Sequence, residues 1–183
     1  MLSSARRARA VAIIFAALSL IGCDAGRPAA TPPIVPGGST APREVNVIAK
    51  DYAFFPNELD LVPGETVLLH VINGGLEVHE AIIGGRAVQD AWEVAEAPTV
   101  GSPPGPTPVV SVPPGVSGIR IVTASGQRVD LTWTVPGDAA ASGATPWIVG
   151  CHIPGHWAKG MQVPIRWVAR ESGGPGSSAT AAP

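Results

Sequence analysis

Short runs in which apolar and polar residues alternate, separated by turn signals, fill the middle of this chain. Glu44–Ala49 and Thr66–Ile72 are rich in β-branched residues, and Phe55-Pro56-Asn57 and Pro63-Gly64 interrupt the alternation between them. Such alternation is typical of half-buried strands, and proline beside glycine or asparagine is typical of turns. The same pattern predicts six further strands, over Glu58–Val62, His79–Ile83, Gly118–Thr123, Arg128–Val135, Trp147–Cys151 and Val163–Ala169. Seven to eight short strands predict an all-β fold, an antiparallel sandwich.

Helical signals are weak along the whole chain. Its 183 residues include 22 glycines and 20 prolines, a composition that favours turns over helices. Ala87–Glu96 predicts a single helical turn, and the proline-rich stretch Ala97–Pro114 predicts a long surface loop. The length suits one ordinary domain with flanking segments.

The first 23 residues have the pattern of an export signal. Arg6, Arg7 and Arg9 precede an apolar run, Ala10–Gly22, that is too short to span a bilayer comfortably. The end of this segment, Leu20-Ile21-Gly22-Cys23, resembles a bacterial lipobox, which implies that Cys23 is acylated and becomes the new N-terminus. An ordinary signal peptide with an incidental cysteine is the alternative. Both the general secretory route and the twin-arginine route are compatible with this start.

Two further segments flank the predicted strands. Residues 24–43 consist mostly of Pro, Ala, Gly, Thr and Ser without apolar periodicity, which predicts a linker. Residues 170–183 are rich in Gly, Ser and Ala, which predicts a disordered tail. The folded domain is therefore expected over residues 44–169.

The charge of the chain excludes one class of partner. The formal net charge is −2, and loss of the export segment would leave nine basic against fourteen acidic residues. Nucleic-acid binding requires a basic patch, and this sequence contains none.

Three side chains of metal-binding type follow one another at five-residue steps near the end of the predicted domain: Cys151, His156 and Met161. Metal–ligand bonds are about 2.0–2.3 Å long and a strand advances about 3.3 Å per residue, so these ligands converge only if the chain turns back. Pro154-Gly155 and Gly160 supply such turns. Cysteine with two histidines and a distant methionine is the ligand set of blue-copper electron-transfer sites. A buried free cysteine with His and Met packed nearby is the alternative.

Cysteine usage supports the metal interpretation. The chain has two cysteines, and the lipobox would claim Cys23, which leaves Cys151 unpaired in an exported protein. Disulfides form in that compartment, so a lone thiol is a liability unless a metal holds it.

The second histidine must come from elsewhere in the chain, and three positions offer one. His70 lies in the middle of a predicted strand, where a polar residue on the strand face is the simpler interpretation. His152 adjoins Cys151, and neighbours on a strand point to opposite faces, so it should point away. His79 follows a loop after a strong strand, a usual place for functional groups. A solvated loop histidine is its alternative.

Together these residues resemble those of the cupredoxin family. The resemblance spans residues 44–169 and rests mainly on Cys151-His152-Ile153-Pro154-Gly155-His156 with Gly160-Met161, which is most similar to the rusticyanin and sulfocyanin branch. It implies a Greek-key β-sandwich that binds one type 1 copper ion. It further implies that His79, Cys151 and His156 are equatorial ligands and that Met161 is axial.

Two positions depart from the family pattern. Many members have Asn or Ser after the first histidine ligand, where it ties the two ligand loops together, but this chain has Glu80. His152 beside the thiolate ligand is also uncommon, and its position would suit an outer-sphere donor or an alternative copper ligand. Because of these two departures, the sequence does not determine which residues support the copper ligands from outside.

The resemblance implies a one-electron carrier and not an enzyme. A copper chaperone or storage protein, which exchanges metal instead of electrons, is the main alternative. A multi-copper enzyme needs more histidines than the four present, and a zinc hydrolase would leave Met161 without a purpose. We expect a monomer, lipid-anchored to the outer face of the cytoplasmic membrane, whose redox partners dock near His156 and Trp157. The apolar residues Ile153, Pro154 and Trp157 are expected around His156.

Overall fold

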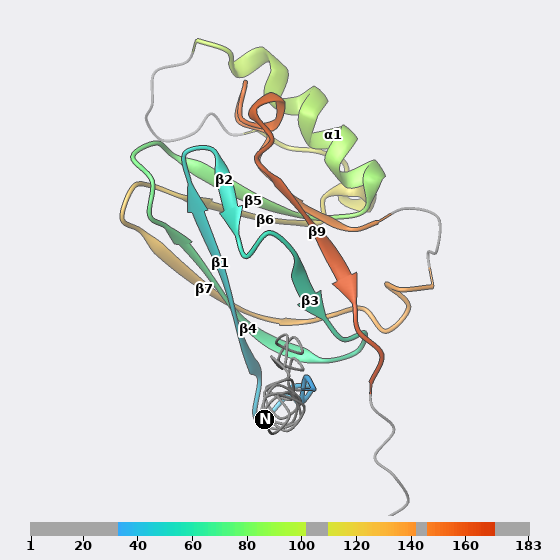
Figure 1. Cartoon of the computed structure of the whole chain (residues 1–183). Helices are drawn as coiled ribbons and strands as arrows, with labels where there is room; N and C mark the ends of the chain where they lie inside the picture. Colours follow the sequence, from blue (N-terminus) through green and yellow to red (C-terminus); the bar gives the residue numbers. More distant parts are fainter. Residues whose placement is uncertain (1–32, 102–109, 142–145, 171–183) are drawn as a thin grey trace, which may run out of the picture. The chain divides into compact units, whose positions relative to one another are not determined.

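The computed structural model describes residues 33–101, 110–141 and 146–170. The strands found there are β1 (Arg43–Lys50), β2 (Ala53–Phe55), β3 (Leu59–Leu61), β4 (Thr66–Asn73), β5 (His79–Gly84), β6 (Ile119–Thr123), β7 (Arg128–Thr134), β8 (Ile148–Gly150) and β9 (Gln162–Trp167). Helix α1 spans Arg86–Glu96, and the 3-10 turns are η1 (Ala97–Thr99), η2 (Pro114–Val116) and η3 (Trp157–Lys159). The all-β sandwich predicted from the sequence is confirmed (Figure 1).

The strands form two sheets that enclose the core. One sheet has the order β2-β1-β4-β7 and the other has the order β3-β9-β8-β5-β6. Along β1, Val45, Val47 and Ala49 are buried while the residues between them are more exposed, as the alternation predicts. Their apolar side chains join those of the second sheet, including Val149 and Val163, in one cluster. The core therefore lies between the sheets.

Strand β5 is buried along its whole length because it is covered on both faces. It pairs with β6 on one side and β8 on the other, and all six of its residues are buried. Helix α1, which follows directly, lies over the outer face of this sheet (Figure 1). Its Gln89 side chain donates to the Ile82 carbonyl of β5, and its Trp92 ring lies under Arg120 of β6. Because both faces of β5 are covered, its last four residues form a continuous apolar run instead of an alternating one.

The expectation of a purely antiparallel arrangement was wrong. β1 pairs with β4 in parallel, and β3 pairs with β9 in parallel. Between β1 and β4 the chain visits the second sheet through β3, so it returns to the first sheet in its original direction, as parallel pairing requires. The alternation also does not predict β2, because Phe55-Pro56-Asn57 is typical of a turn. The described residues hold nine strands instead of seven to eight.

Helix α1 is longer than the single turn expected within Ala87–Glu96. It has 11 residues, and the side chains it buries are Gln89, Trp92 and Glu96. Two of these are polar, so the buried face carries little of the apolar periodicity that predicts helices. Among the described residues, none of the helices is long and apolar enough to cross a membrane.

The flanking segments fall largely outside the described residues. The predicted signal, the lipobox at Cys23, and residues 171–183 of the predicted tail all lie there, as do residues 102–109 of the predicted long loop. The last part of the predicted linker is described, and its Gly37 carbonyl accepts a hydrogen bond from the Thr66 N–H (3.0 Å) at the start of β4.

Candidate metal centre

His79 is the first residue of β5, and its fully buried ring is held between two polar partners. Its Nε2 atom lies 2.7 Å from Asp51 Oδ1, so this nitrogen donates its hydrogen to the carboxylate. Its Nδ1 atom lies 3.3 Å from Nδ1 of His156. Because the proton sits on Nε2, the lone pair on Nδ1 is free to face a metal.

Cys151 and His156 come from the loop that joins β8 to β9. The loop turns back at Gly155 (φ 90°) and Gly160 (φ 89°), both in the left-handed region that favours glycine. His156 Nδ1 thereby lies 3.3 Å from Cys151 Sγ. The loop is closed by hydrogen bonds from the Met161 N–H to the His156 carbonyl (3.2 Å) and from the Cys151 N–H to the Met161 carbonyl (3.1 Å).

His79, Cys151 and His156 form one buried group whose ligand atoms all lie within 4.8 Å of one another. Ligands about 2.0–2.3 Å from a shared metal in a trigonal plane stand about 3.5–4 Å apart, which agrees with these separations. One thiol and two imidazoles suit copper by their softness. The residues present therefore fit the metal that the sequence predicts.

Met161 lies beside this group. Its side chain is fully buried, and its backbone is hydrogen-bonded to both Cys151 and His156. Its thioether would supply the weak fourth ligand that the sequence predicts. Copper binding by these four side chains stays a prediction.

The surroundings of Cys151 make its free thiol hard to ionise. Burial raises the pKa of this thiol to about 12, although N–H groups of Glu80 and Ile153 pull the pKa down. The Glu80 N–H points at Sγ from 3.5 Å. Since a ligating thiol must lose its proton, a bound cation is needed to stabilise the thiolate here.

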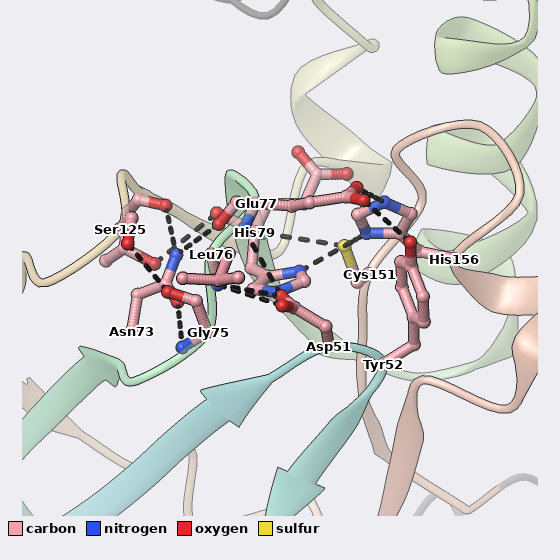
Figure 2. A network of polar contacts seen from close by, with 12 residues as sticks. Asp51, Tyr52, Asn73, Gly75, Leu76, Glu77, His79, Ser125, Cys151 and His156 are labelled. Carbon is pink, nitrogen blue, oxygen red and sulfur yellow. Dashed lines mark hydrogen bonds and ion pairs between the residues drawn. The ribbon is translucent and has the colours of Figure 1, made fainter.

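Each of the two histidines contacts a carboxylate that the sequence did not reveal as part of the site. Behind His156, Glu77 Oε2 lies 3.2 Å from Nε2, just as Asp51 does behind His79 (Figure 2). Hydrogen bonds from the Leu76 N–H and from His79 lower the pKa of Asp51. Hydrogen bonds from Tyr52 and His156 lower the pKa of Glu77. Carboxylates of this kind fix the ring orientation of metal-ligating histidines.

The loop before His79 is tied to the same carboxylate. Asp51 accepts hydrogen bonds from the N–H groups of Leu76 (2.9 Å) and Glu77 (3.3 Å) in addition to the one from His79. A Cβ at Gly75 would collide with this carboxylate, so glycine allows the close approach. Asp51 thus joins the ligand and its loop into one unit, as Figure 2 shows.

Glu80 links the strand that carries His79 to the loop that carries Cys151. Its Oε1 atom accepts the N–H of His152 (3.0 Å), and its own N–H points at Cys151 Sγ. The two ligand loops are therefore tied together by a carboxylate. Burial raises the pKa of Glu80 to about 6, and its Oε2 atom is paired with Arg120 (2.8 Å).

The two remaining histidines lie where the sequence placed them. His70 sits on β4 in the other sheet, with Nδ1 2.7 Å from Asp130 Oδ1. His152 points away from the metal group toward α1, where its nitrogens meet Gln89 and Glu93. Neither belongs to the group of metal-binding side chains in the described residues.

The outer side of His156 is more polar than expected. Its ring packs edge-on against Tyr52 at 4.9 Å, and the Tyr52 hydroxyl donates to Glu77 (2.7 Å). The Lys159 ammonium lies over the Tyr52 ring. Trp157, the residue after His156, stacks its ring on His152 at 4.6 Å. Charged groups therefore lie next to His156 together with apolar ones.

Solved structures of similar fold include three auracyanins, one of which is titled a "blue" copper protein. The auracyanin of Roseiflexus castenholzii, solved after dithionite reduction, shares 18% identity at a TM-score of 0.52, covering 72% of this chain and 99% of that one. Auracyanin A of Chloroflexus aurantiacus, titled a "blue" copper protein, shares 23% at 0.52, covering 71% and 100%. Auracyanin B shares 22% at 0.51, covering 73% and 97%. No protein-family model and no curated protein matches this chain. The chain therefore has the cupredoxin fold, and its buried His79, Cys151 and His156 fit a single type 1 copper ion.

Proposed function

We propose that this protein carries single electrons through one type 1 copper ion and is not an enzyme. The observation that supports this most strongly is the buried His-Cys-His group with a carboxylate behind each histidine. Copper bound there would supply a Cu(I)/Cu(II) couple. The side chains around it have the task of keeping the ligands in place in both states.

The fold restrains these ligands well. His79 is anchored by a strand and by Asp51, and Cys151 and His156 belong to a loop closed by backbone hydrogen bonds. Ligands restrained in this way rearrange little when the charge of the site changes by one. Small rearrangement permits fast electron exchange.

Burial also favours the unprotonated form of His156, which is the form that binds a cation. Loss of solvent, and then the nearby His79, lower the pKa of His156 below its ordinary value. A lowered pKa means that protons compete for Nδ1 only at a lower pH than they would in an exposed histidine. At His156, protons should therefore compete with copper only in more acidic solution, whereas binding at Cys151 releases the thiol proton at any pH below about 12 and so weakens as the pH falls.

The experiment is a titration of residues 24–183 with Cu(II). We expect an intense visible thiolate-to-copper band that saturates at one equivalent, because a short Cys–copper bond mixes the orbitals of sulfur and metal. A pale solution at saturation would contradict the type 1 assignment.

Metal transfer is less well supported as a function. Direct exchange with another protein needs ligands that the partner can reach, whereas Cys151 and His79 are fully buried and His156 is 4% exposed. A chaperone role would require the ligand loop to open.

We propose further that redox partners dock over the face at His156 and Trp157. Leu76 belongs to this face because its neighbour Glu77 binds the outer nitrogen of His156, and its side chain is 86% exposed. An exposed apolar residue beside a buried ligand allows close, transient contact.

Leu76→Glu should slow electron self-exchange between oxidised and reduced copies several-fold, because the new carboxylate must be desolvated in each encounter. Line broadening in NMR spectra of mixed samples measures this rate. Val35→Glu is the matched control, because Val35 is 79% exposed and lies two residues before Gly37, which binds the start of β4 at the opposite end of the sandwich; it should leave the rate unchanged. Equal rates in both variants would place the contact elsewhere.

We also propose export and anchoring through Cys23, which lies outside the described residues. Several acyl chains on a processed cysteine hold a protein at a membrane stably, whereas one chain does so marginally. Cys23→Ser should therefore leave the protein unprocessed or release it from membranes, as fractionation and mass measurement would show. Unchanged mature mass and unchanged membrane association would refute the lipobox.

A further inference from the structure

His152 directly follows Cys151 and is enclosed by side chains that play no part in the metal group. The residue is 3% exposed. Its Nε2 atom lies 2.8 Å from Gln89 Oε1, and its Nδ1 atom lies 2.7 Å from Glu93 Oε2. Trp157 stacks on the ring at 4.6 Å with an interplanar angle of 17°. Two of the three partners come from helix α1.

Gln89 is fixed firmly enough to act as an anchor. Its Nε2 atom donates to the carbonyls of Ile82 (3.2 Å), Gly84 (3.2 Å) and Ile148 (3.0 Å), on strands β5 and β8. Because these three acceptors hold the amide nitrogen, the amide oxygen is left to face His152. The orientation of Gln89 is thus set by the sheet and not by His152.

The backbone of His152 is anchored as well. Its N–H donates to Glu80 Oε1 (3.0 Å), and Glu80 is paired with Arg120 (2.8 Å). Arg120 also binds Glu96 on α1 (2.8 Å). Helix α1 therefore holds His152 through its ring directly and through its backbone by way of Arg120 and Glu80.

Gly150, on the other side of Cys151, leaves room for this arrangement. A Cβ at Gly150 would meet Gln89 Oε1 at 2.5 Å and a ring carbon of Trp157 at 2.6 Å. Both atoms belong to partners of His152, so any larger residue would push them from the ring. The residues on both sides of Cys151 thus serve the same contact.

We propose that His152 is a positioning residue that anchors the Cys151 loop to helix α1 and so keeps the cysteine sulfur against His79 and His156. This inference rests on the proposed function, since the sulfur held in place is the expected copper ligand. His152 does not touch the metal position in this account. His152 acts through the peptide bond to Cys151. Because an anchored His152 fixes the backbone of Cys151, the sulfur atom can move only by rotation about the Cα–Cβ bond of Cys151.

The test compares His152→Phe with His70→Phe. His70 is a matched control because it is 4% exposed and its Nδ1 atom lies 2.7 Å from Asp130 Oδ1 and 2.8 Å from Arg128 Nη2, but it belongs to the other sheet. Phenylalanine keeps a ring and removes both polar contacts. Both variants should lose stability, but only His152→Phe should change the visible and EPR spectra of bound Cu(II) and speed copper loss to a chelator about tenfold. Wild-type spectra and release rate in folded His152→Phe would overturn the proposal.

A milder pair of variants covers the case in which His152→Phe does not fold. Glu93→Ala removes one anchor, and Asp90→Ala on the same helix is its control, because both side chains are 57% exposed. In copper-free protein, hydrogen exchange of the Cys151 amide should become severalfold faster in Glu93→Ala and stay unchanged in Asp90→Ala. Equal exchange in the two would refute the anchoring. A wild-type protein that binds no copper would refute the proposed function alone, since this exchange needs no metal.

Discussion

Replacing Cys151 by serine should abolish the intense visible band of the copper-loaded protein completely. The band requires electron donation from a thiolate sulfur to Cu(II), and a hydroxyl oxygen is a hard donor that does not supply it. Cys151 is fully buried within 3.3 Å of a second ligand atom, and no other cysteine lies in the described residues. Optical titration with Cu(II) measures the effect directly.

The control for this substitution is a test that Cys151→Ser still folds. Serine is nearly the same size as cysteine, so the circular dichroism of copper-free Cys151→Ser should match that of the wild type. A folded Cys151→Ser protein that still turned blue with Cu(II) would show that the sulfur ligand had been assigned wrongly.

Asp51→Asn should weaken copper binding by about 10–100-fold, the usual cost of losing an outer partner of a ligating histidine. The carboxylate accepts hydrogen bonds from His79 Nε2 (2.7 Å), the Leu76 N–H and the Glu77 N–H at once. An asparagine amide has one oxygen, so at least one of these donors loses its partner or faces an N–H group. Even where the amide oxygen replaces Oδ1, the bond that orients the His79 ring loses its charge assistance and becomes weaker.

Competition with a chelator of known affinity measures this change. Asp60→Asn is the matched control, because the Asp60 side chain is 25% exposed against 26% for Asp51 and is paired with Arg166 instead of a metal-group residue. The control should bind copper as the wild type does. Equal affinities of both variants would mean that Asp51 does not support His79.

The expected ligands are local in sequence, which is why the sequence could suggest them. Cys151, His156 and Met161 lie on one loop whose turn residues are visible in the sequence. His79 could be preferred over His70 and His152 from strand alternation and loop position. The structure brings His79, Cys151 and His156 together, and it places His152 on the opposite side.

The outer partners could not be found in this way because they depend on contacts between distant segments. Asp51 is 28 residues from His79, and Glu77 is 79 residues from His156. A carboxylate just after the first strand, and another two residues before His79, were the available signals, and neither has a distinctive spacing. Tyr52 reaches His156 only because β1 and β2 bring it to the same end of the sandwich.

In the fold, too, local features could be predicted from the sequence, whereas features that depend on distant segments could not. Alternation located eight strands, since each strand's pattern is contained within it. It missed β2, which has three residues, and it misjudged the parallel pairs, which are set by the path of the chain between sheets. It also underestimated α1, whose buried Gln89 and Glu96 serve polar contacts to the site's surroundings.

Repeated redox cycling of the copper-loaded protein tests the central claim most directly. In cyclic voltammetry the protein should show one reversible one-electron wave, and copper measured after ultrafiltration should remain with the protein in both oxidation states. Buried, doubly anchored ligands predict this retention. Release of copper into the filtrate on reduction, with the wave lost, would contradict an electron carrier and indicate a protein that exchanges metal.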